Sequence, residues 1–396
     1  MSTPIFNSLG SNYTSIFASK ARSMLLFPPA NQQPYLTKQL STSTHPHVYL
    51  FYKARHAITF ALTSARLPAN SQVLTQAFTC WAVEEAILNA NLKLAFVDTA
   101  PKSLNPTLDE FKQAFKKNPN TKAVIIQHTL GQPAEIKTIA SWCKQKNLFL
   151  IEDLAHSVGA IDSDNQPVGT YADAVVYSFG RDKIIDAVSG GACALKYETK
   201  PPAPDSLPPV QQYQDLLYPT FTQLIRNHYS SGIGKILHFA LTKITLLSSP
   251  IANPTPNLTA LPSTHAALAI EAFARHPQTN KLRSQIANTY QQNLPKAIQL
   301  SIDVYNSSNL RFPILIKKRA KLISYLKANN FYLSDTWYKH PVETGKLKVN
   351  TSYQLNSCPN AEYLAKHLCN LPTHINITPQ QAKQLSLLVN KFLTSQ

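Results

Sequence analysis

The segment YSFGRDKIIDAVSGGACAL, residues 177–195, places a polar loop between two apolar runs. The runs AVVYSF (174–179) and ACALK (192–196) have the length and composition of buried strands. The loop carries Lys183 and ends in a pair of glycines, which allow a tight turn or the close approach of another group. A lysine held between two buried strands is a candidate for chemistry as well as for the solvated surface.

Short apolar runs upstream of this segment alternate with helix-like stretches. We expect strands at residues 73–78, 94–97, 123–127 and 148–152, and helices at 82–89, 107–117 and 134–146. Strands that alternate with helices are typical of a three-layer α/β domain with a mostly parallel, buried sheet. Ligands of such sheets bind beyond the carboxyl ends of the strands, so a site is expected at those ends.

Polar side chains follow the predicted strands where each one ends. Asp98, His128 and Asp153 come directly after the second, third and fourth strands, and Ser178 lies near the end of the fifth. Lys183 is in the loop beyond that fifth strand. Six of the ten glycines lie between residues 131 and 191, beside the same strand ends. The sequence therefore predicts one site at this edge of the sheet.

The length of 396 residues fits two domains. We expect a large domain at 1–250 and a smaller α/β domain at 251–396. A long helical pattern begins at His265, with a kink expected at Pro277. The later elements expected are a strand at 310–316 and helices at 320–329 and 380–393.

The formal net charge of +17 favours phosphate-bearing ligands, anionic lipid or nucleic acid as partners. The basic residues are scattered and no nucleic-acid-binding motif is present, which argues against a dedicated nucleic-acid binder. The five cysteines form no CxxC pair, as in reduced intracellular proteins. No signal-peptide pattern and no apolar run of about 18 residues occurs, so we expect a cytoplasmic protein.

One apolar segment fits none of these elements. Residues 234–250, GKILHFALTKITLLSSP, are apolar with Lys235, His238 and Lys243 interspersed. A buried or dimer-contact helix and a helix lying on a membrane surface both fit this pattern. The sequence leaves these alternatives open.

The polar residues behind successive strands suit one cofactor. A lysine becomes a nucleophilic amine when its surroundings lower its pKa. Pyridoxal 5'-phosphate requires a lysine for its aldehyde, an acid for its ring nitrogen, and hydroxyl and amide donors for its phosphate. Lys183, Asp153 and Ser178 supply these groups, and His156 lies three residues after the acid. Each residue alone has an ordinary structural explanation, whereas the ordered set is specific.

Two motifs give the chain a recognisable likeness. IEDLAHSVGA (151–160) and AVVYSFGRDKIIDAVSGGACAL (174–195) resemble the DegT/DnrJ/EryC1/StrS aminotransferases. The stretches 73–99, 127–136 (QHTLGQPAEI) and 358–374 are similar to further blocks of that family, as is the helix that begins at His265. The resemblance implies a fold-type-I pyridoxal-phosphate enzyme with a seven-stranded sheet, a small C-terminal domain and a homodimeric assembly.

The resemblance also implies roles for individual residues. Lys183 would bond covalently to the cofactor aldehyde and move a proton during the reaction. Asp153 would pair with the pyridine nitrogen, His156 would contact the ring, and Ser178 would bind the phosphate. The remaining candidates for cofactor binding are Ala54, Arg55, His56, Cys80, Trp81 and Asn257.

The chain departs from the family pattern at three of these places. Ala54 replaces a glycine in the phosphate-binding turn formed with Arg55 and His56. Cys80 stands where a ring-stacking aromatic is common, with Trp81 next to it. The family's NxR motif is not intact, because Leu258 and Ala260 occupy its places and Asn257 lies beside them.

The resemblance implies transfer of an amino group from a donor such as glutamate to a nucleotide-linked keto-sugar. Retention of Lys183 favours transamination over the family's lysine-lacking dehydratases. Two alternatives remain open. One is another fold-type-I enzyme, such as a lyase or desulfurase, and the other is a non-catalytic or regulatory homologue that binds the cofactor.

Overall fold

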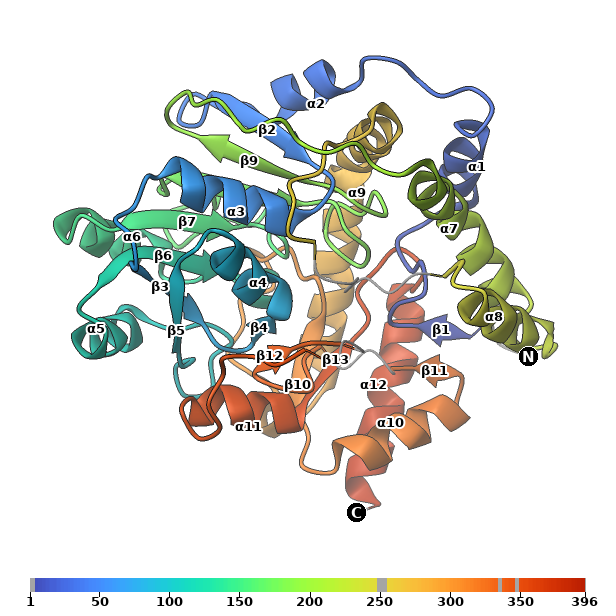
Figure 1. The fold of residues 1–396 in the computed structure, drawn as a ribbon. Helices are drawn as coiled ribbons and strands as arrows, with labels where there is room; N and C mark the ends of the chain where they lie inside the picture. Colours follow the sequence, from blue (N-terminus) through green and yellow to red (C-terminus); the bar gives the residue numbers. More distant parts are fainter. Residues whose placement is uncertain (1–3, 248–254, 334–336, 346–348, 396) are drawn as a thin grey trace.

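A computed structural model describes residues 4–247, 255–333, 337–345 and 349–395. Its largest sheet has seven strands in the order β2-β9-β8-β7-β6-β3-β5 (Figure 1). Their bounds are β2 His47–Phe51, β3 Gln72–Gln76, β5 Lys93–Val97, β6 Thr121–Gln127, β7 Phe149–Asp153, β8 Ala174–Ser178 and β9 Gly191–Leu195. Strand β9 pairs antiparallel with both β2 and β8, and the other pairings are parallel. The mostly parallel sheet predicted from the sequence is confirmed.

Helices cover both faces of this sheet (Figure 1). Side chains of a strand alternate between the two faces, and neighbours in β3 lie in different cores. Val73 packs with α3 (Ala54–Ser64) and α4 (Trp81–Asn89). Leu74 packs instead with α5 (Leu108–Lys117) and α6 (Ile136–Gln145). The three-layer arrangement is therefore present, and the helices predicted from the sequence fall within about two residues of these bounds.

A second core lies mainly in the C-terminal part of the chain. Strands β10 (Phe312–Leu315) and β13 (Leu368–Leu371) pair antiparallel beside the long helix α9 (Ser263–Asn293). Helix α9 continues through Pro277, so the expected kink does not end it. The other elements of this part are η2 Lys296–Ile298, α10 Arg319–Ala328, β11 Phe331–Tyr332, β12 Val342–Glu343, α11 Pro359–His367 and α12 Pro379–Thr394.

Two long-range pairings join the parts of the chain. Strand β1 (Ile5–Phe6) pairs parallel with β11, and Ile5 contributes to the C-terminal core. Strand β12 pairs parallel with β4 (Thr79–Cys80), which directly precedes α4. The division expected near residue 250 falls outside the described residues and stays a prediction.

Of the remaining helices, α2 lies beside β2, and α1, α7 and α8 lie together near β1 (Figure 1). The bounds of the remaining helices are α1 Ser15–Ser23, α2 Gln33–Leu40, η1 Thr129–Gly131, α7 Pro209–Asn227 and α8 Ile233–Lys243. Within α8 only Gly234 and Leu241 are buried, so this part of the segment is not buried within its own chain, while the dimer contact and the membrane-surface helix stay predictions. Among the described residues, no helix combines the length and the hydropathy needed to cross a membrane.

Candidate active site

A cavity of about 330 Å³ opens at the carboxyl ends of β7 and β8. It is lined by six of the residues predicted from the sequence, namely Ala54, Arg55, Cys80, Asp153, Ser178 and Lys183. Strand ends and the start of α3 bring them together, although they are up to about 130 positions apart in the chain. The expectation of one site at this edge of the sheet agrees with this placement.

The amine of Lys183 contacts a buried histidine. Lys183 Nζ lies 3.0 Å from His156 Nε2, and His156 Nδ1 accepts a 3.2 Å hydrogen bond from the amide of Leu130. Burial, followed by the charges of Lys183 and Arg311, holds the pKa of His156 well below its usual value, so the ring is neutral. Because an amide can only donate, the ring proton is on Nε2 and points at Lys183. The Nζ atom of Lys183 therefore lies next to this N–H group.

An aromatic ring lies next to this pair. Trp337 stacks on His156 with the ring centroids 5.0 Å apart, and Lys183 Nζ lies 4.7 Å from the indole centroid. Two buried isoleucines, Ile184 and Ile185, follow the lysine and pack into the core beside it. The amine therefore lies among apolar groups, and poor solvation favours its neutral form.

Asp153 is the buried carboxyl group of the cavity. Its Oδ1 accepts a hydrogen bond of 2.9 Å from the amide of Ala155, and its Oδ2 lies 3.4 Å from the Gln127 side-chain nitrogen. Burial raises the pKa of Asp153, while the Ala155 amide and the charge of Lys183 oppose that change. A buried carboxyl with one weakly held oxygen is suited to pairing with a protonated ring nitrogen.

At the start of α3, the cavity is lined by hydrogen-bond donors that could bind an anion. Helix α3 starts at Ala54, and its N-cap residue Lys53 makes no side-chain capping bond, so the first-turn amides are left for another acceptor. Ala54 has no positive φ, so its replacement of the family's glycine creates no backbone strain. A Cβ at Gly191 would come within 2.6 Å of the Ala54 nitrogen, which explains why a glycine passes this turn.

Lys53 adds a cation at this end, and sequence reasoning missed it. Its Nζ lies 3.1 Å from Ser189 Oγ and 4.4 Å from the centroid of the Tyr52 ring. Burial lowers the pKa of Lys53 to about 8; among the nearby charges Asp215 raises it, whereas Arg181 and Arg55 lower it. The signal that could have located Lys53 was its position directly before the predicted phosphate turn.

Four predicted residues do not line the cavity. His156 is buried and contacts Lys183 Nζ from outside the cavity lining, and Trp81 is buried as well. His56 accepts from the amide of Thr259, and burial lowers its pKa to about 4. Asn257 donates to Asp205. Between Cys80 and Trp81, it is therefore Cys80 that faces the cavity.

Further lining residues come from segments that the motifs did not mark. Gln127 and Arg181 lie beside predicted site residues and could have been found from them. Trp337, Lys339 and Glu343 come from the segment around β12, more than 150 positions beyond Lys183. No local pattern in that segment indicates a site.

Asp215, a buried residue of α7, bonds several side chains near the end of the cavity that carries Lys53 and the start of α3. Asp215 accepts from the Tyr52 hydroxyl at 2.5 Å, from Arg181 Nη2 at 3.1 Å, and lies 3.1 Å from His265 Nε2. Burial alone would raise its pKa, but the hydrogen bond and charge of His265 and the charge of Arg181 hold the pKa of Asp215 below its usual range. Arg181 also stacks on Tyr218, 3.7 Å from the ring centroid.

We expect Asp215→Ala to lower the free energy of unfolding by about 3–5 kcal/mol, because it breaks the buried ion pair with Arg181 and the buried hydrogen bond from Tyr52. The lowered pKa means that the stabilising contribution is present at neutral pH and is lost as pH falls below about 4, where the unfolded carboxyl binds a proton. Urea unfolding at neutral and acid pH checks both statements. Asp164→Ala, which removes an exposed ion pair with Lys137, is the control and should cost less than about 1 kcal/mol.

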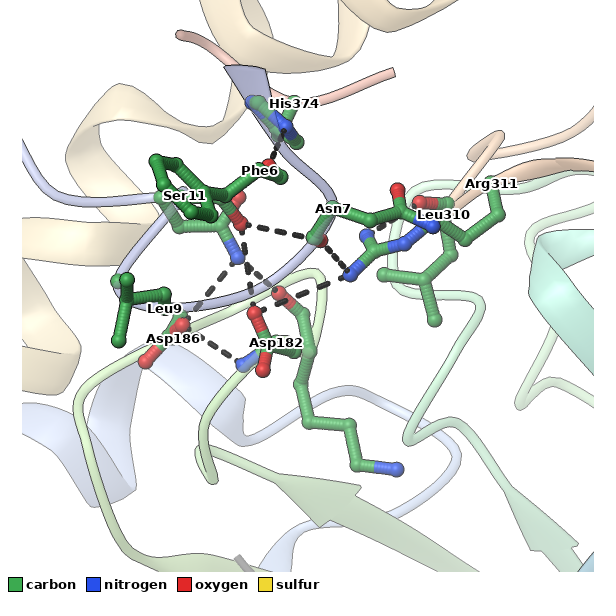
Figure 2. A network of polar contacts seen from close by, with 12 residues as sticks. Phe6, Asn7, Leu9, Ser11, Asp182, Asp186, Leu310, Arg311 and His374 are labelled. Carbon is green, nitrogen blue, oxygen red and sulfur yellow. Dashed lines mark hydrogen bonds and ion pairs between the residues drawn. The ribbon is translucent and has the colours of Figure 1, made fainter. Parts of the chain in front are cut away.

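The loop of the lysine is held by the N-terminal segment, as Figure 2 shows. Asn12 Nδ2 donates to the carbonyl of Lys183 at 3.2 Å, and Ser11 Oγ donates to Asp182 at 3.3 Å. Arg311, which is fully buried, donates to the carbonyl of Asn7 at 2.6 Å and lies 3.8 Å from Asp182. The backbone that carries the lysine is therefore held from two distant parts of the chain, the N-terminal segment and Arg311.

Comparison with known families gives one match across most of the chain. The model of the DegT/DnrJ/EryC1/StrS aminotransferase family matches residues 24–200 and 257–389. These two ranges contain every residue that the sequence singled out for the site. They leave out residues 201–256, which include α7 and α8.

Curated relatives are similar over different lengths. A dTDP-4-dehydro-2,3,6-trideoxy-D-glucose 4-aminotransferase of Saccharopolyspora spinosa is 39% identical over 28% of this chain, and the match spans 28% of that protein. A pleiotropic regulatory protein of Geobacillus stearothermophilus is 25% identical over 85% of this chain and 82% of its own length. The chain thus matches little more than a quarter of the first relative and most of the second.

Solved structures show the same fold over the whole chain. The structure of DesI with its TDP-sugar product superposes with a TM-score of 0.71 at 18% identity, covering 100% of this chain and 96% of that one. The pyridoxal-phosphate form of the putative sugar aminotransferase Spr1654 from Streptococcus pneumoniae gives 0.68 at 18% identity, covering 98% of each chain. At this identity the likeness establishes the fold.

Proposed function

The chain belongs to the DegT/DnrJ/EryC1/StrS aminotransferase family, and from this we propose that it transfers an amino group from an amino acid such as glutamate to a nucleotide-linked keto-sugar. The observation that supports this most directly is the position of the Lys183 amine. Its Nζ lies 3.0 Å from His156 Nε2, and the side chain lines one cavity with Asp153 and the start of α3.

The residues present fit pyridoxal 5'-phosphate, the cofactor of this family. Lys183 offers the amine for its aldehyde, and Asp153 offers a carboxyl for its ring nitrogen. Ser178 and the first amides of α3, together with Lys53, form a donor set for its phosphate. The buried Gln127 Oε1, in the cavity wall, has no hydrogen-bond partner among the described residues and is open to a ligand donor.

When bound, the cofactor supplies a ring that takes up negative charge from the substrate carbon. The side chains around it bind, orient and move protons. Lys183 Nζ would take a proton from the substrate Cα and release it again within the cavity, a role that requires the neutral form of the amine. Asp153 keeps the ring nitrogen protonated, and Trp337 covers the amine from solvent.

The substrate class follows from charge and from relatives. Lys53, Arg181 and Lys339 line the cavity, and the chain carries a net charge of +17, which suits a nucleotide diphosphate. The name of the first relative specifies amination of a dTDP-linked sugar. We propose a nucleotide-linked keto-sugar as the acceptor on these two grounds.

A regulatory role is the second candidate. Of the two curated relatives described above, the one matched over the greater length is a pleiotropic regulatory protein. In addition, the NxR motif near Asn257 is not intact in this chain. On this hypothesis the protein would hold the cofactor without turning over. Purified protein that binds pyridoxal phosphate and accepts an amino group from no donor would favour the regulator.

The test is a two-step measurement on the purified protein loaded with pyridoxal phosphate. Glutamate or glutamine should convert the bound cofactor to its amine form, read by absorbance, and a panel of nucleotide-linked keto-sugars should then give an amino-sugar nucleotide, read by mass spectrometry. The same protein without donor is the blank. Failure of the first step with every amino acid tried would reject the aminotransferase.

We also propose a cytoplasmic homodimer. All five cysteines are free, as expected in a reducing compartment. Asn257 lies at the surface of its own chain, where a partner subunit's cavity could be reached. Light scattering of the purified protein tests the dimer.

Lys53→Met should weaken binding of pyridoxamine 5'-phosphate about 10- to 100-fold, because a charged hydrogen bond to phosphate is lost. Wild-type affinity should be highest below pH 8 and should fall as pH rises through about 8, where Lys53 loses its proton. The phosphate stays doubly charged over this range, since its second pKa is about 6. Calorimetry with pyridoxamine, which lacks the phosphate, is the control. An equal loss for both ligands would argue against a phosphate contact.

A further inference from the structure

Helix α8 presents an apolar face to solvent. Ile233, Ile236, Phe239 and Ile244 are 60%, 71%, 69% and 59% exposed. The first three recur every third residue and so share one side of the helix, and Ile244 at its C-cap returns to that side. Large exposed side chains gathered on one helix face mark an interaction surface, whereas single ones do not.

The helix is firmly held on its inner side. A Cβ at Gly234 would come within 2.2 Å of the Ile225 carbonyl oxygen, so α8 crosses the end of α7 at backbone contact. The amide of Gly234 donates to the carbonyl of His228 at 2.8 Å, and Leu241 is the other buried residue of α8. The outward face is therefore fixed in direction by the fold.

The charged side chains of the segment that carries this face are all basic. The sequence has no Asp or Glu between Asp215 and Glu271, while Arg226, Lys235 and Lys243 fall in that interval. Lys235 and Lys243 are exposed on α8 itself. Helices with an apolar face and lysines beside it bind at the boundary of a membrane, where the long lysine stems reach the headgroups.

We propose that α8 is a docking surface for an anionic lipid membrane, with its apolar face entering the headgroup boundary and its lysines on the lipid phosphates. The surface belongs to the segment 201–256, which the family match leaves out. This proposal is independent of the reaction.

A second copy of the chain fits the same face less well. A two-fold contact through α8 would place Lys235 and Lys243 against the same residues of the partner, with no carboxylate in the segment to neutralise them. The net charge of +17 on each copy adds to that repulsion. An anionic lipid surface supplies the missing negative charge.

Flotation of the full-length protein with lipid vesicles tests the proposal. We expect the protein to float with vesicles of equal parts phosphatidylcholine and phosphatidylglycerol, and to stay at the bottom with phosphatidylcholine alone. The double variant Ile236→Ser with Phe239→Ser should reduce the floating fraction at least about tenfold. Lys235→Glu with Lys243→Glu should do the same at low salt.

The matched control is Leu355→Ser with Leu387→Ser, which removes two leucines that are 77% and 60% exposed outside α8. Its flotation should equal that of the wild type. The proposal is overturned if wild-type protein does not float, if neutral and anionic vesicles carry it equally, or if the α8 variants float as the control does. A wild-type dimer that the apolar variant converts to a monomer, without flotation, would assign the face to a second copy.

Discussion

Lys183→Ala is expected to lower transamination by at least about 1,000-fold, because it removes both the nucleophilic amine and the group that moves the proton. Borohydride reduction of the wild type in the presence of pyridoxal phosphate should attach the cofactor to the peptide that contains Lys183, and mass spectrometry of the variant should find no such adduct. The geometry behind this expectation is the place of Lys183 in the cavity beside Asp153, with Nζ 3.0 Å from His156 Nε2.

Two controls separate chemistry from structure in that experiment. Lys183→Arg keeps a positive charge without a nucleophilic amine and should be as inactive as the alanine variant. Lys196→Ala removes a partly exposed lysine at the far end of β9 and should leave turnover unchanged. An adduct at another lysine, or turnover within tenfold of the wild type in Lys183→Ala, would show that the site has been misassigned.

Asp153→Asn should keep the cofactor bound but lower turnover about 100- to 1,000-fold, because an amide does not hold the ring nitrogen protonated. The measurement is the rate of the half-reaction with glutamate, followed by absorbance at saturating cofactor. The affinity for pyridoxal phosphate should change much less than the rate.

Asp98→Asn is the matched control for that variant, since both aspartates follow strands of the same sheet. Asp98 accepts hydrogen bonds from the amides of Asn360 and Ala361, at 3.0 and 2.8 Å, and so caps the start of α11. Its replacement should lower stability and leave the half-reaction rate intact. Near-normal turnover in Asp153→Asn would remove its role at the ring nitrogen.

The large sheet was predictable because most of its strands can be recognised from short stretches of sequence. The five parallel strands are short apolar runs bounded by polar residues, and each predicted range overlaps the strand observed. Strand β2 was not predicted, although four of its five residues, HVYLF, are apolar or aromatic, and its antiparallel partner β9 lies at least 140 residues away. The two-residue strands β1 and β12 carry no local signal at all, since distant partners alone define them.

The candidate site divides in the same way. Asp153, Ser178 and Lys183 could be proposed from sequence because each follows its own strand within a few residues. Trp337 and Lys339 could not, because the segment that carries them reaches the cavity only through tertiary packing. The sequence could not decide between Cys80 and Trp81, because the two residues are adjacent at the start of α4. Cys80 is the N-cap of this helix and lines the cavity, whereas Trp81 is its first residue and is buried.

The N-terminal clamp on the lysine loop has a consequence for how the protein is made. Strand β1 emerges early from the ribosome, but its partner β11 is more than 320 residues away, and Arg311 is also translated late. Residues 5–7 must therefore wait for these partners, whereas Ser11 and Asn12 can contact the loop of Lys183 as soon as that loop has formed. The full set of contacts that holds the loop is complete only after Arg311 and β11 have been made.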